Sequence, residues 1–555
     1  MPGRAGQVLR PRGDKKLAWG SDHESVRAGS GMVATPHGLA TEAGRAVLEE
    51  GGNAVEAALA AAAAIAVVYP HMNQIGGDGF WLIRDANGRV GYFEAAGYAG
   101  AKATPAFYRE RGYDEDVLPS RGPLAALTVP GQIGGWQLAH EAARELGGKM
   151  PARRLLEAAI GHARQGCQVS LSQHRLTTQK KDELASVPGF AGTFLNEDGA
   201  APEPGATQRF ARLADTLEHL SRAGLDDFYR GDVGREIAAD LEKAGSPVTR
   251  EDLAHYHAVR RRPLHVKLST MELWGSPPPT QGLATLMILA LFDRLGVARP
   301  EGFAHIHGLV EATKRAFLIR DKVVTDFDRL AHEPADFLTA DALEREVAAI
   351  DPGRAAPWPH RAAPGDTIWL GAADKNGLAV SYIQSIYWEF GSGLVLPSTG
   401  VLMQNRGTSF SLDPKALNPL QPGRRPFHTL NPGMAKLADG RVVAFGCMGG
   451  EGQPQTNAAV MSRYALFGAP LGEAIARPRW VLGRTWGSPS VSLKLEGAFD
   501  GALAEQLERA GHEVEIIPEA YSDMMGHAGA VVIHPGKAGL EGAHDPRSDG
   551  GALGV

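Results

Sequence analysis

One stretch in the second half of the chain, 364–393, most restricts what the chain can fold into. It reads PGDTIWLGAADKNGLAVSYIQSIYWEFGSG, and its two runs of β-branched and aromatic residues flank the pair Asn376-Gly377. Asn-Gly between two such runs is typical of the tight turn of a β-hairpin. The preceding segment, 351–366, contains four prolines, which exclude a helix or a central strand. The stretch therefore predicts a kinked loop that leads directly into a hairpin whose first strand begins at Thr367.

The junction between this loop and the strand places a hydroxyl residue, Thr367, directly after Asp366. We predict that the chain cuts itself between these two residues, so that Thr367 becomes a new N-terminus. An α-amine has an ordinary pKa of about 7 to 8, so the new amine could serve as the base for the hydroxyl of its own residue. The alternative is an uncut hairpin that follows a surface loop.

Composition narrows the class of protein. Of 555 residues, 43% are hydrophobic and 22% are charged, which is ordinary for a soluble globular protein. The net charge of -6 gives no reason to expect nucleic acid or an anionic membrane as a partner. Cys167 and Cys447 are too few for a disulfide framework and lack metal-ligand spacing. We therefore expect both cysteines to be buried, and we predict neither a metal nor a cofactor.

The N-terminal 30 residues are polar and lack the apolar core of a signal peptide. The longest apolar run, 57–69, is too short to span a bilayer. We therefore expect residues 1–30 to form a mobile leader, and we expect the protein to be cytoplasmic.

Three motifs in the first hundred residues predict local structure. Asn53 followed by Glu56 is typical of a capping box at the start of an alanine-rich helix. Asn87-Gly88 predicts a second hairpin. The run 76–79, Gly-Gly-Asp-Gly, lacks the ending and the following helix of a phosphate loop, so we interpret it as a tight turn and exclude a nucleotide site.

The central hairpin, with Gly-Asp-Thr at 365–367 before it and Gly-Ser-Gly at 391–393 after it, resembles the start of the small subunit in the γ-glutamyltransferase family. Members of that family are N-terminal-nucleophile hydrolases that cleave themselves before a threonine. Other short motifs follow the family's order, so the resemblance covers roughly residues 30–550 of the chain. Examples are FYRG at 228–231, TREDLAHY at 249–256, SPPPTQG at 276–282 and LVEATKRAF at 309–317.

The resemblance implies an α/β (α+β) fold, a four-layer αββα sandwich with helices outside two packed sheets. Residues 31–366 would form the large subunit and residues 367–555 the small subunit, and the two together would make one compact domain. The fragments would remain associated, and two such heterodimers could pair.

The resemblance also assigns catalytic roles. Thr367 would supply the nucleophile and the α-amine base, and Ser385, at the position of a second threonine, would orient that nucleophile. The backbone N–H groups of Gly449 and Gly450 would form an oxyanion hole. A purely structural serine and a plain turn at the two glycines are the alternatives.

The substrate-contacting positions depart from the glutamyl pattern. Glutamyl members carry an arginine before the AKAT segment, where this chain has Ala96, Gly97 and Tyr98. Ser409 replaces an aspartate of the family's QMDDF motif, and Tyr387 replaces an asparagine after the second threonine. These departures argue against γ-glutamyl transfer.

Arg406, in place of that motif's glutamine, suggests a different substrate. A guanidinium can bind a carboxylate through two parallel hydrogen bonds. Tyr387 would fill space, while His428 and Thr429 replace the family's serine pair and add a donor. The pattern is similar to the oxamate amidohydrolase and glutaryl-cephalosporin acylase branches, and it predicts a pocket for a short acidic amide. A structural ion pair is the alternative role for Arg406.

The main hypothesis is thus a self-processing amidohydrolase that hydrolyses a small acidic amide through a threonine acyl-enzyme. The alternatives are a γ-glutamyltransferase or glutathione hydrolase, a glutaryl-type acylase and, more remotely, an uncleaved non-catalytic homologue that serves as a binding module. The predicted site residues are Asp366, Thr367, Ser385, Tyr387, Arg406, Ser409, His428, Thr429, Gly449 and Gly450.

Overall fold

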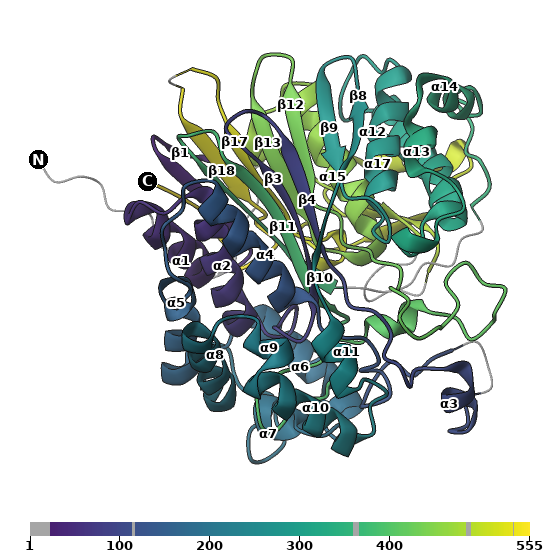
Figure 1. Ribbon diagram of the computed structural model, residues 1–555. Helices are drawn as coiled ribbons and strands as arrows, with labels where there is room; N and C mark the ends of the chain where they lie inside the picture. Colours follow the sequence, from purple (N-terminus) through teal and green to yellow (C-terminus); the bar gives the residue numbers. More distant parts are fainter. Residues whose placement is uncertain (1–22, 114–116, 359–365, 484–489, 537) are drawn as a thin grey trace, which may run out of the picture.

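The fold is built on two seven-stranded sheets stacked face to face, with helices on both outer sides (Figure 1). It is seen in a computed structural model that describes residues 23–113, 117–358, 366–483, 490–536 and 538–555. The side chain of Asp366 and the loop 359–365, part of the predicted proline-rich segment, lie outside the described residues. This arrangement is the four-layer αββα sandwich that the sequence predicts.

The first sheet, called here the hairpin sheet, contains the central hairpin, and all its strand pairs are antiparallel. Its strands in spatial order are β19 (Gly551–Gly554), β2 (Gly31–Thr35), β10 (Asp366–Asp374), β11 (Ala379–Tyr387), β3 (Asp78–Arg84), β4 (Val90–Ala95) and β7 (Val259–Arg261).

The second sheet is also antiparallel throughout. Its strands in spatial order are β1 (Val26–Ala28), β18 (Leu540–His544), β17 (Ala528–Ile533), β13 (Val442–Cys447), β12 (Gly433–Leu437), β9 (Met271–Gly275) and β8 (Leu264–Lys267). Small sheets elsewhere use β5 (Cys167–Gln168), β6 (Thr207–Gln208), β14 (Trp480–Leu482), β15 (Leu493–Glu496) and β16 (Val514–Ile517).

Each sheet has its own helical layer. The outer face of the hairpin sheet packs on α1 (Gly38–Glu49), α2 (Ala54–Val68) and α4 (Gln132–Glu145). The outer face of the second sheet packs on α12 (Gly282–Arg294) and α15 (Gln453–Met461), and α13 (Phe303–Val323) packs on these two helices. The remaining helices are α3 (Pro105–Arg109), α5 (Ala152–Gln165), α6 (Leu171–Leu184), α7 (Phe190–Phe194), α8 (Ala211–Ala223), α9 (Asp227–Arg230), α10 (Asp232–Ala244), α11 (Arg250–His255), α14 (Ala340–Ala348), α16 (Leu471–Ala476) and α17 (Gly501–Arg509).

The local predictions from turns and caps are confirmed. Asn376-Gly377 forms the turn of the β10–β11 hairpin, with Gly377 at φ +89°, and Asn87-Gly88 joins β3 to β4. At the start of α2, Asn53 accepts from the backbone of Glu56 while Glu56 accepts from the backbone of Asn53. Such a cap is worth about 1 kcal/mol. Strand β10 begins at Asp366, one residue earlier than expected.

The two sheets meet in a layer of buried side chains that includes Trp369, Ile383, Met434 and Val531. A polar pair also links the sheets. Trp369 Nε1 donates to Ser381 Oγ at 2.9 Å, and Ser381 Oγ donates to the carbonyl of Phe445 on β13 at 2.9 Å. Because a Trp N–H needs a partner once it is buried, this pair fixes the position of β10 against the second sheet.

Both predicted fragments contribute to both sheets. In the hairpin sheet, β2 from the N-terminal part lies between β19 and β10 from the C-terminal part. In the second sheet, β1 pairs with β18 and β9 pairs with β12. Strand β1 falls in the stretch expected to be a leader, whose residues 1–22 lie outside the described part of the chain.

Candidate active site

Thr367 lies in an irregular position of β10. The pairing with β11 shifts between Asp366, which is opposite Tyr387, and Ile368, which is opposite Gln384. A bulge of this kind redirects a side chain, and such bulges are frequent beside active sites. The Thr367 side chain is fully buried, and its Oγ1 accepts a hydrogen bond of 3.4 Å from Gln453 Nε2.

Ser385 is buried on the neighbouring strand β11. Its Oγ accepts a hydrogen bond of 2.7 Å from the backbone N–H of Tyr387. Tyr387 has φ +83°, a left-handed conformation that costs a non-glycine residue about 1 to 3 kcal/mol and that clusters at functional sites. The orienting role of Ser385 toward Thr367 stays a prediction.

Gly449 and Gly450 follow β13 and lead into α15. Their φ angles of +120° and +55° lie in the region that favours glycine. Successive backbone N–H groups in such turns form concave sites for negatively charged atoms. Gln281 Nε2 donates to the carbonyl of Gly450 at 2.9 Å, and Arg320 Nη1 donates to Gln281 Oε1 at 2.9 Å. The paired glycines are therefore held by a buried network.

Arg406 is a fully buried cation. Its guanidinium lies 3.7 Å from the centre of the Tyr387 ring, and its Nη1 donates to Thr429 Oγ1 at 3.3 Å. Its Nε and Nη2 have no hydrogen-bond partner among the described residues, and no described acid forms an ion pair with it. Burial lowers the pKa of Arg406 to about 10, so the side chain stays charged at neutral pH. This environment argues against the structural ion pair.

His428, next to Thr429, is also fully buried. Its Nε2 lies 3.2 Å from Oδ2 of the equally buried Asp78. Burial, followed by the charge of Arg406, lowers the pKa of His428 to about 4. The imidazole is therefore neutral at pH 7. Ser409, at the end of a 3-10 turn that begins at Arg406, is only partly buried.

In the segment where glutamyl members would carry an arginine, Gly97 has no room for a side chain. The N–H of Gly97 donates to Asp78 Oδ1 at 2.9 Å, and a Cβ placed on Gly97 would lie 1.5 Å from the carbonyl oxygen of Val129. Tyr98 donates its hydroxyl to the carbonyl of Asp252 at 2.7 Å. The substituted segment thus offers no cation for a substrate carboxylate.

A chain of hydrogen bonds connects Thr367 to the arginine. Gln453 donates to Thr367 and accepts from both the backbone and the side chain of Asn431, at 3.2 and 3.1 Å. Asn431 Nδ2 in turn donates to the carbonyl of Thr429, the residue that Arg406 contacts. Sequence reasoning missed Gln453, Asn431 and Asp78. Their signal was slight, because each lies far in sequence from the residue it supports.

One cluster in the described part of the chain has the composition of a metal site. His307, Glu311 and His512 are buried, and their ligand atoms lie within 4.8 Å of one another. However, the Lys314 ammonium lies 2.7 Å from Glu311 Oε1 and balances its charge. His307 Nδ1 and His512 Nε2 hydrogen-bond each other at 2.9 Å. These partners satisfy the cluster without an ion, and a cation would have to displace them.

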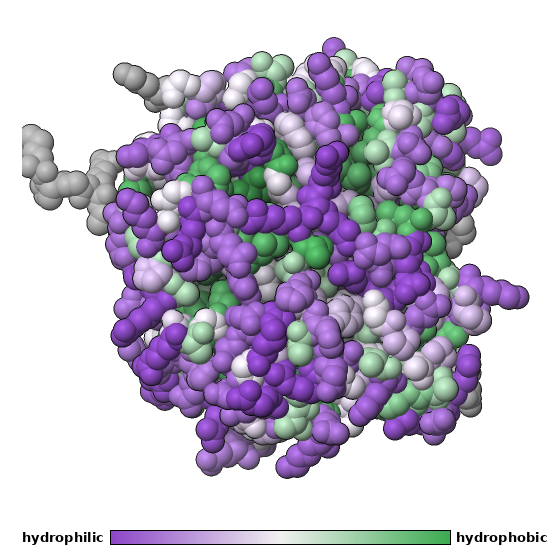
Figure 2. Space-filling view, viewed as in Figure 1, coloured by the Kyte–Doolittle hydropathy of each residue, from purple (hydrophilic) through white to green (hydrophobic). Residues whose placement is uncertain are grey.

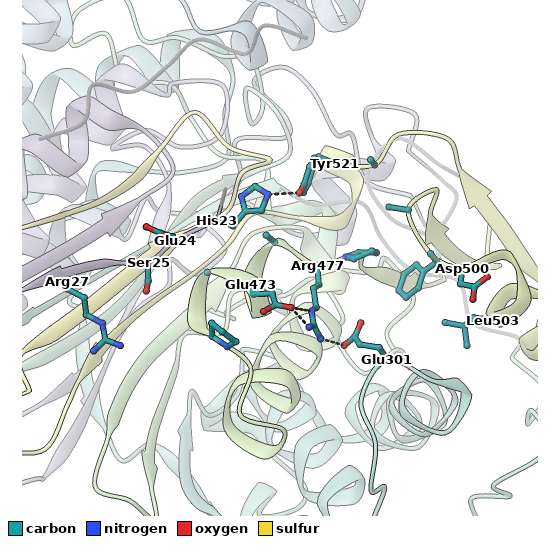
Figure 3. Close-up of a pocket in the computed structure, with 17 residues that line it drawn as sticks. His23, Glu24, Ser25, Arg27, Glu301, Glu473, Arg477, Asp500, Leu503 and Tyr521 are labelled. Atoms are coloured by element: carbon teal, nitrogen blue, oxygen red, sulfur yellow. Dashed lines mark hydrogen bonds and ion pairs between the residues drawn. The ribbon is translucent and has the colours of Figure 1, made fainter. Parts of the chain in front are cut away.

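A cavity of about 870 Å³ lies at a different place, between the start of the described chain and the C-terminal region (Figure 3). Its wall includes the His23–Tyr521 hydrogen bond and Arg477, which pairs with Glu473 and Glu301. None of the predicted site residues lines it. The predicted chemistry is therefore independent of this cavity.

On the face shown in Figure 2, hydrophilic residues cover most of the molecule, and hydrophobic ones form separate patches between them. Among the described helices, none is both long enough and apolar enough to cross a bilayer. Both cysteines are buried and unpaired, as expected.

Two stacked antiparallel sheets between helical layers define the N-terminal-nucleophile hydrolase class, and Thr367 lies at the start of an inner strand of that fold. Comparison with known proteins agrees. Residues 40–555 match the family described as gamma-glutamyltranspeptidase. The chain belongs to the γ-glutamyltranspeptidase family and is an amidohydrolase of the N-terminal-nucleophile type.

Two curated proteins and one solved structure are similar to this chain over nearly its whole length. The chain is 50% identical to the oxamate amidohydrolase proenzyme of Klebsiella pneumoniae, over 96% of this chain and 100% of that protein. It is 37% identical to the glutathione hydrolase-like YwrD proenzyme of Bacillus subtilis, over 96% and 100%. Among solved structures, cephalosporin acylase from Bacillus halodurans superposes with a TM-score of 0.88 at 31% identity, covering 98% of this chain and 99% of that one.

Proposed function

We propose that this protein is a self-processing amidohydrolase that hydrolyses the amide bond of a small acidic substrate of the oxamate type. The observation that carries the proposal is Arg406, a fully buried guanidinium with Nε and Nη2 unpartnered among the described residues. Those two N–H groups match the two oxygens of a carboxylate. The similarity to the Klebsiella oxamate amidohydrolase proenzyme supports the same class of substrate.

The first half of the reaction forms an acyl-enzyme. The free α-amine of Thr367 takes the proton of its own hydroxyl, and Oγ1 attacks the amide carbon. The N–H groups of Gly449 and Gly450 stabilise the oxyanion of the tetrahedral intermediate. When the intermediate collapses, the C–N bond breaks, and the leaving nitrogen takes the proton from the α-ammonium to depart as the free amine.

Water completes the cycle. The α-amine accepts a proton from the attacking water, the ester bond to Thr367 breaks, and the hydroxyl recovers its proton. Arg406 binds the substrate carboxylate in both halves, so the reacting carbonyl stays in place between them. The products are ammonia and a dicarboxylate when the substrate is an unsubstituted oxamate-type amide.

Self-cleavage gives the first prediction. In the uncut chain the nitrogen of Thr367 is part of an amide, so the base does not exist and the precursor should be inactive. We expect fragments 1–366 and 367–555 that remain associated, and the smaller fragment should begin Thr-Ile-Trp-Leu. Denaturing gel electrophoresis and N-terminal sequencing measure both properties. Thr367→Ala should remain one inactive chain.

A matched control is Thr313→Ala, which removes another buried threonine hydroxyl on α13. This variant should process normally. If Thr367→Ala is still cut at the same bond, the nucleophile assignment is wrong. A single full-length band in fully active wild-type protein would overturn self-processing itself and favour an uncut enzyme.

A hydrolysis screen separates the substrate classes within the family. Oxamate should be hydrolysed fastest, with glutaryl amides and γ-glutamyl anilides far behind. A glutaryl-type acylase would invert that order. Transfer of a γ-glutamyl group to a dipeptide acceptor would show a γ-glutamyltransferase instead.

A further inference from the structure

Asp78 and His428 form a buried pair that the proposed reaction does not yet use. Asp78 begins β3 directly opposite Ser385 on β11, so it lies next to the strand that carries the predicted catalytic residue. Its Oδ1 accepts from the N–H groups of Gly97 and Gly131, at 2.9 and 3.0 Å. Its Oδ2 makes no hydrogen bond among the described residues and lies 3.2 Å from His428 Nε2, a close contact that is not aligned as a hydrogen bond. Asp78 thus holds two backbone segments and faces the imidazole with its second oxygen.

This contact sets the tautomer of His428. A carboxylate oxygen can only accept, so the imidazole nitrogen beside it, Nε2, carries the proton. The ring is neutral, so the other nitrogen, Nδ1, is a bare acceptor. Neither ring nitrogen makes a hydrogen bond among the residues that the structure describes, but Nε2 lies 3.2 Å from the Asp78 carboxylate, which favours the proton on that nitrogen and leaves Nδ1 as the acceptor. A buried acceptor left without a donor is costly, and it marks a position where a ligand can supply one.

Arg406 places a complementary group near this acceptor. It donates to Thr429, which directly follows His428, and its charge acts on the imidazole. These two buried side chains therefore offer unpartnered donors on Arg406 and an unpartnered acceptor on His428. A ligand that satisfies both must carry a carboxylate and an N–H group.

We infer that His428 Nδ1 accepts a hydrogen bond from the amide nitrogen of the substrate, and that Asp78 is the positioning residue that fixes this tautomer. The inference rests on the proposed function and names its substrate class more closely, as unsubstituted amides directly adjacent to a carboxylate. In such a molecule, H₂N–CO–CO₂⁻, Arg406 takes the carboxylate and His428 takes the amide N–H. The pair therefore makes the site specific for the leaving nitrogen as well as for the acid.

Pyruvate is the probe that isolates this contact, because it replaces the NH₂ of oxamate by CH₃ and keeps the carboxylate and the shape. Wild-type protein should bind oxamate about ten- to a hundredfold more tightly than pyruvate, the usual worth of one buried hydrogen bond. In active protein the KM of oxamate and the inhibition constant of pyruvate compare the two molecules, and calorimetry measures the affinity of pyruvate, and that of oxamate wherever oxamate is not hydrolysed.

Two variants test the assignment. In Asp78→Asn, Oδ1 still accepts from Gly97 and Gly131, but an NH₂ group faces Nε2 and forces the proton onto Nδ1. The acceptor becomes a donor, so the preference for oxamate over pyruvate should disappear. In His428→Phe, a ring still fills the space but no acceptor replaces Nδ1, and the preference should be lost too. Phe80→Leu, which changes a ring packed 4.9 Å from the imidazole, should keep the preference.

The expected result is a preference that vanishes in both Asp78→Asn and His428→Phe while pyruvate affinity and melting temperature stay near the wild-type values. Equal affinities for oxamate and pyruvate in the wild type would overturn the inference, as would a preference that survives in His428→Phe. Oxamate that binds with this preference but is not hydrolysed would refute the proposed function and leave the inference standing. Oxamate hydrolysis that does not depend on His428 would refute the inference and leave the proposed function standing. Failure of the wild type to bind either molecule would overturn both.

Discussion

Burial of the Arg406 guanidinium destabilises the fold but prepares the site to bind an anion. A fully buried guanidinium loses its hydration, and the fall of its pKa to about 10 reflects that loss. The Tyr387 ring 3.7 Å away and the Thr429 hydroxyl offset only part of it. A substrate carboxylate would supply the missing countercharge, which explains why the position carries arginine rather than a neutral residue.

Removal of this cation gives a prediction at the same scale. Arg406→Ala should lower kcat/KM for oxamate by about 2 to 4 kcal/mol in transition-state binding, or roughly thirty- to a thousandfold. Arg406→Lys keeps the charge without the planar fork, so it should recover only part of the activity. Steady-state kinetics on oxamate and on its uncharged analogue oxamide make the comparison.

Processing at the bond before Thr367 serves as the internal control, because no carboxylate that needs Arg406 takes part in it. Both variants should be cut at the wild-type rate. Equal losses on oxamate and oxamide, together with slow processing, would mean that Arg406 has a structural role and anchors no carboxylate.

Single residues also mark the limit of what the sequence predicted. Thr367 and the paired glycines could be proposed from a family resemblance, since they stand in recognisable motifs. Asp78 was interpreted as part of a tight turn, and Gln453 was not considered. Both acquire their importance from strand register and helix packing that join distant segments, such as the pairing of Asp78 with Ser385. No local pattern specifies such a neighbour.

At the scale of elements, the central hairpin packs closely against the second sheet. Trp369 on β10 is buried against β13, where Gly446 gives it room. A Cβ on Gly446 would lie 2.2 Å from Trp369 Cδ1 and 2.5 Å from its Nε1. The ring cannot retreat easily, because its Nε1 is hydrogen-bonded to Ser381.

A matched pair of glycine substitutions tests this packing. Gly446→Ala should lower the free energy of unfolding by about 1 to 3 kcal/mol, since the added methyl overpacks the space between the sheets. Gly161→Ala, within helix α5 and with open space at its Cβ, should raise it by about 0.5 to 1 kcal/mol. Thermal or denaturant unfolding measures both. An unchanged stability in Gly446→Ala would show that Trp369 can shift.

Elements were the most predictable level of the structure. The two Asn-Gly turns and the Asn53 capping box could be read locally, because each depends on residues at most a few positions apart. The 130–320 region is mainly helical, but among its short strands β7, β8 and β9 join the two large sheets. Those short strands owe their existence to partners elsewhere in the sheets, such as β12 and β4, that local propensity cannot indicate.

At the scale of the whole molecule, buried histidines link stability to pH. His305 is fully buried, its Nδ1 accepts from the N–H of Glu301, and burial lowers its pKa to about 3. His428 has a pKa of about 4 for the same reason. An unfolded histidine titrates near its ordinary value of about 6.5. Between the folded and unfolded pKa values, the unfolded chain binds more protons than the folded one. The contribution of these histidines to the free energy of unfolding is therefore complete above pH 6.5 and is lost as the pH falls.

The melting temperature should therefore decline steadily from about pH 6.5 toward pH 4. A histidine with the pKa of His305 contributes on the order of 4 kcal/mol to this loss once the pH reaches its folded pKa. His305→Gln should be less stable at pH 7 but should show a shallower decline. His255 is exposed, so His255→Gln serves as the control and should leave the pH dependence of the melting temperature unchanged. A pH-independent melting temperature down to pH 4 would contradict the prediction.

The strand order β19–β2–β10 has a consequence for how the protein refolds before and after cleavage. One strand from the N-terminal fragment lies between two from the C-terminal fragment, so neither half can complete the hairpin sheet alone. While the chain is continuous, its halves meet at a fixed effective concentration. Once the chain is cut, refolding requires that two separate fragments meet, so its yield depends on the concentration of the fragments. The cut that frees the α-amine would thus make folding a one-way event, in which a molecule that unfolds after activation at high dilution does not return.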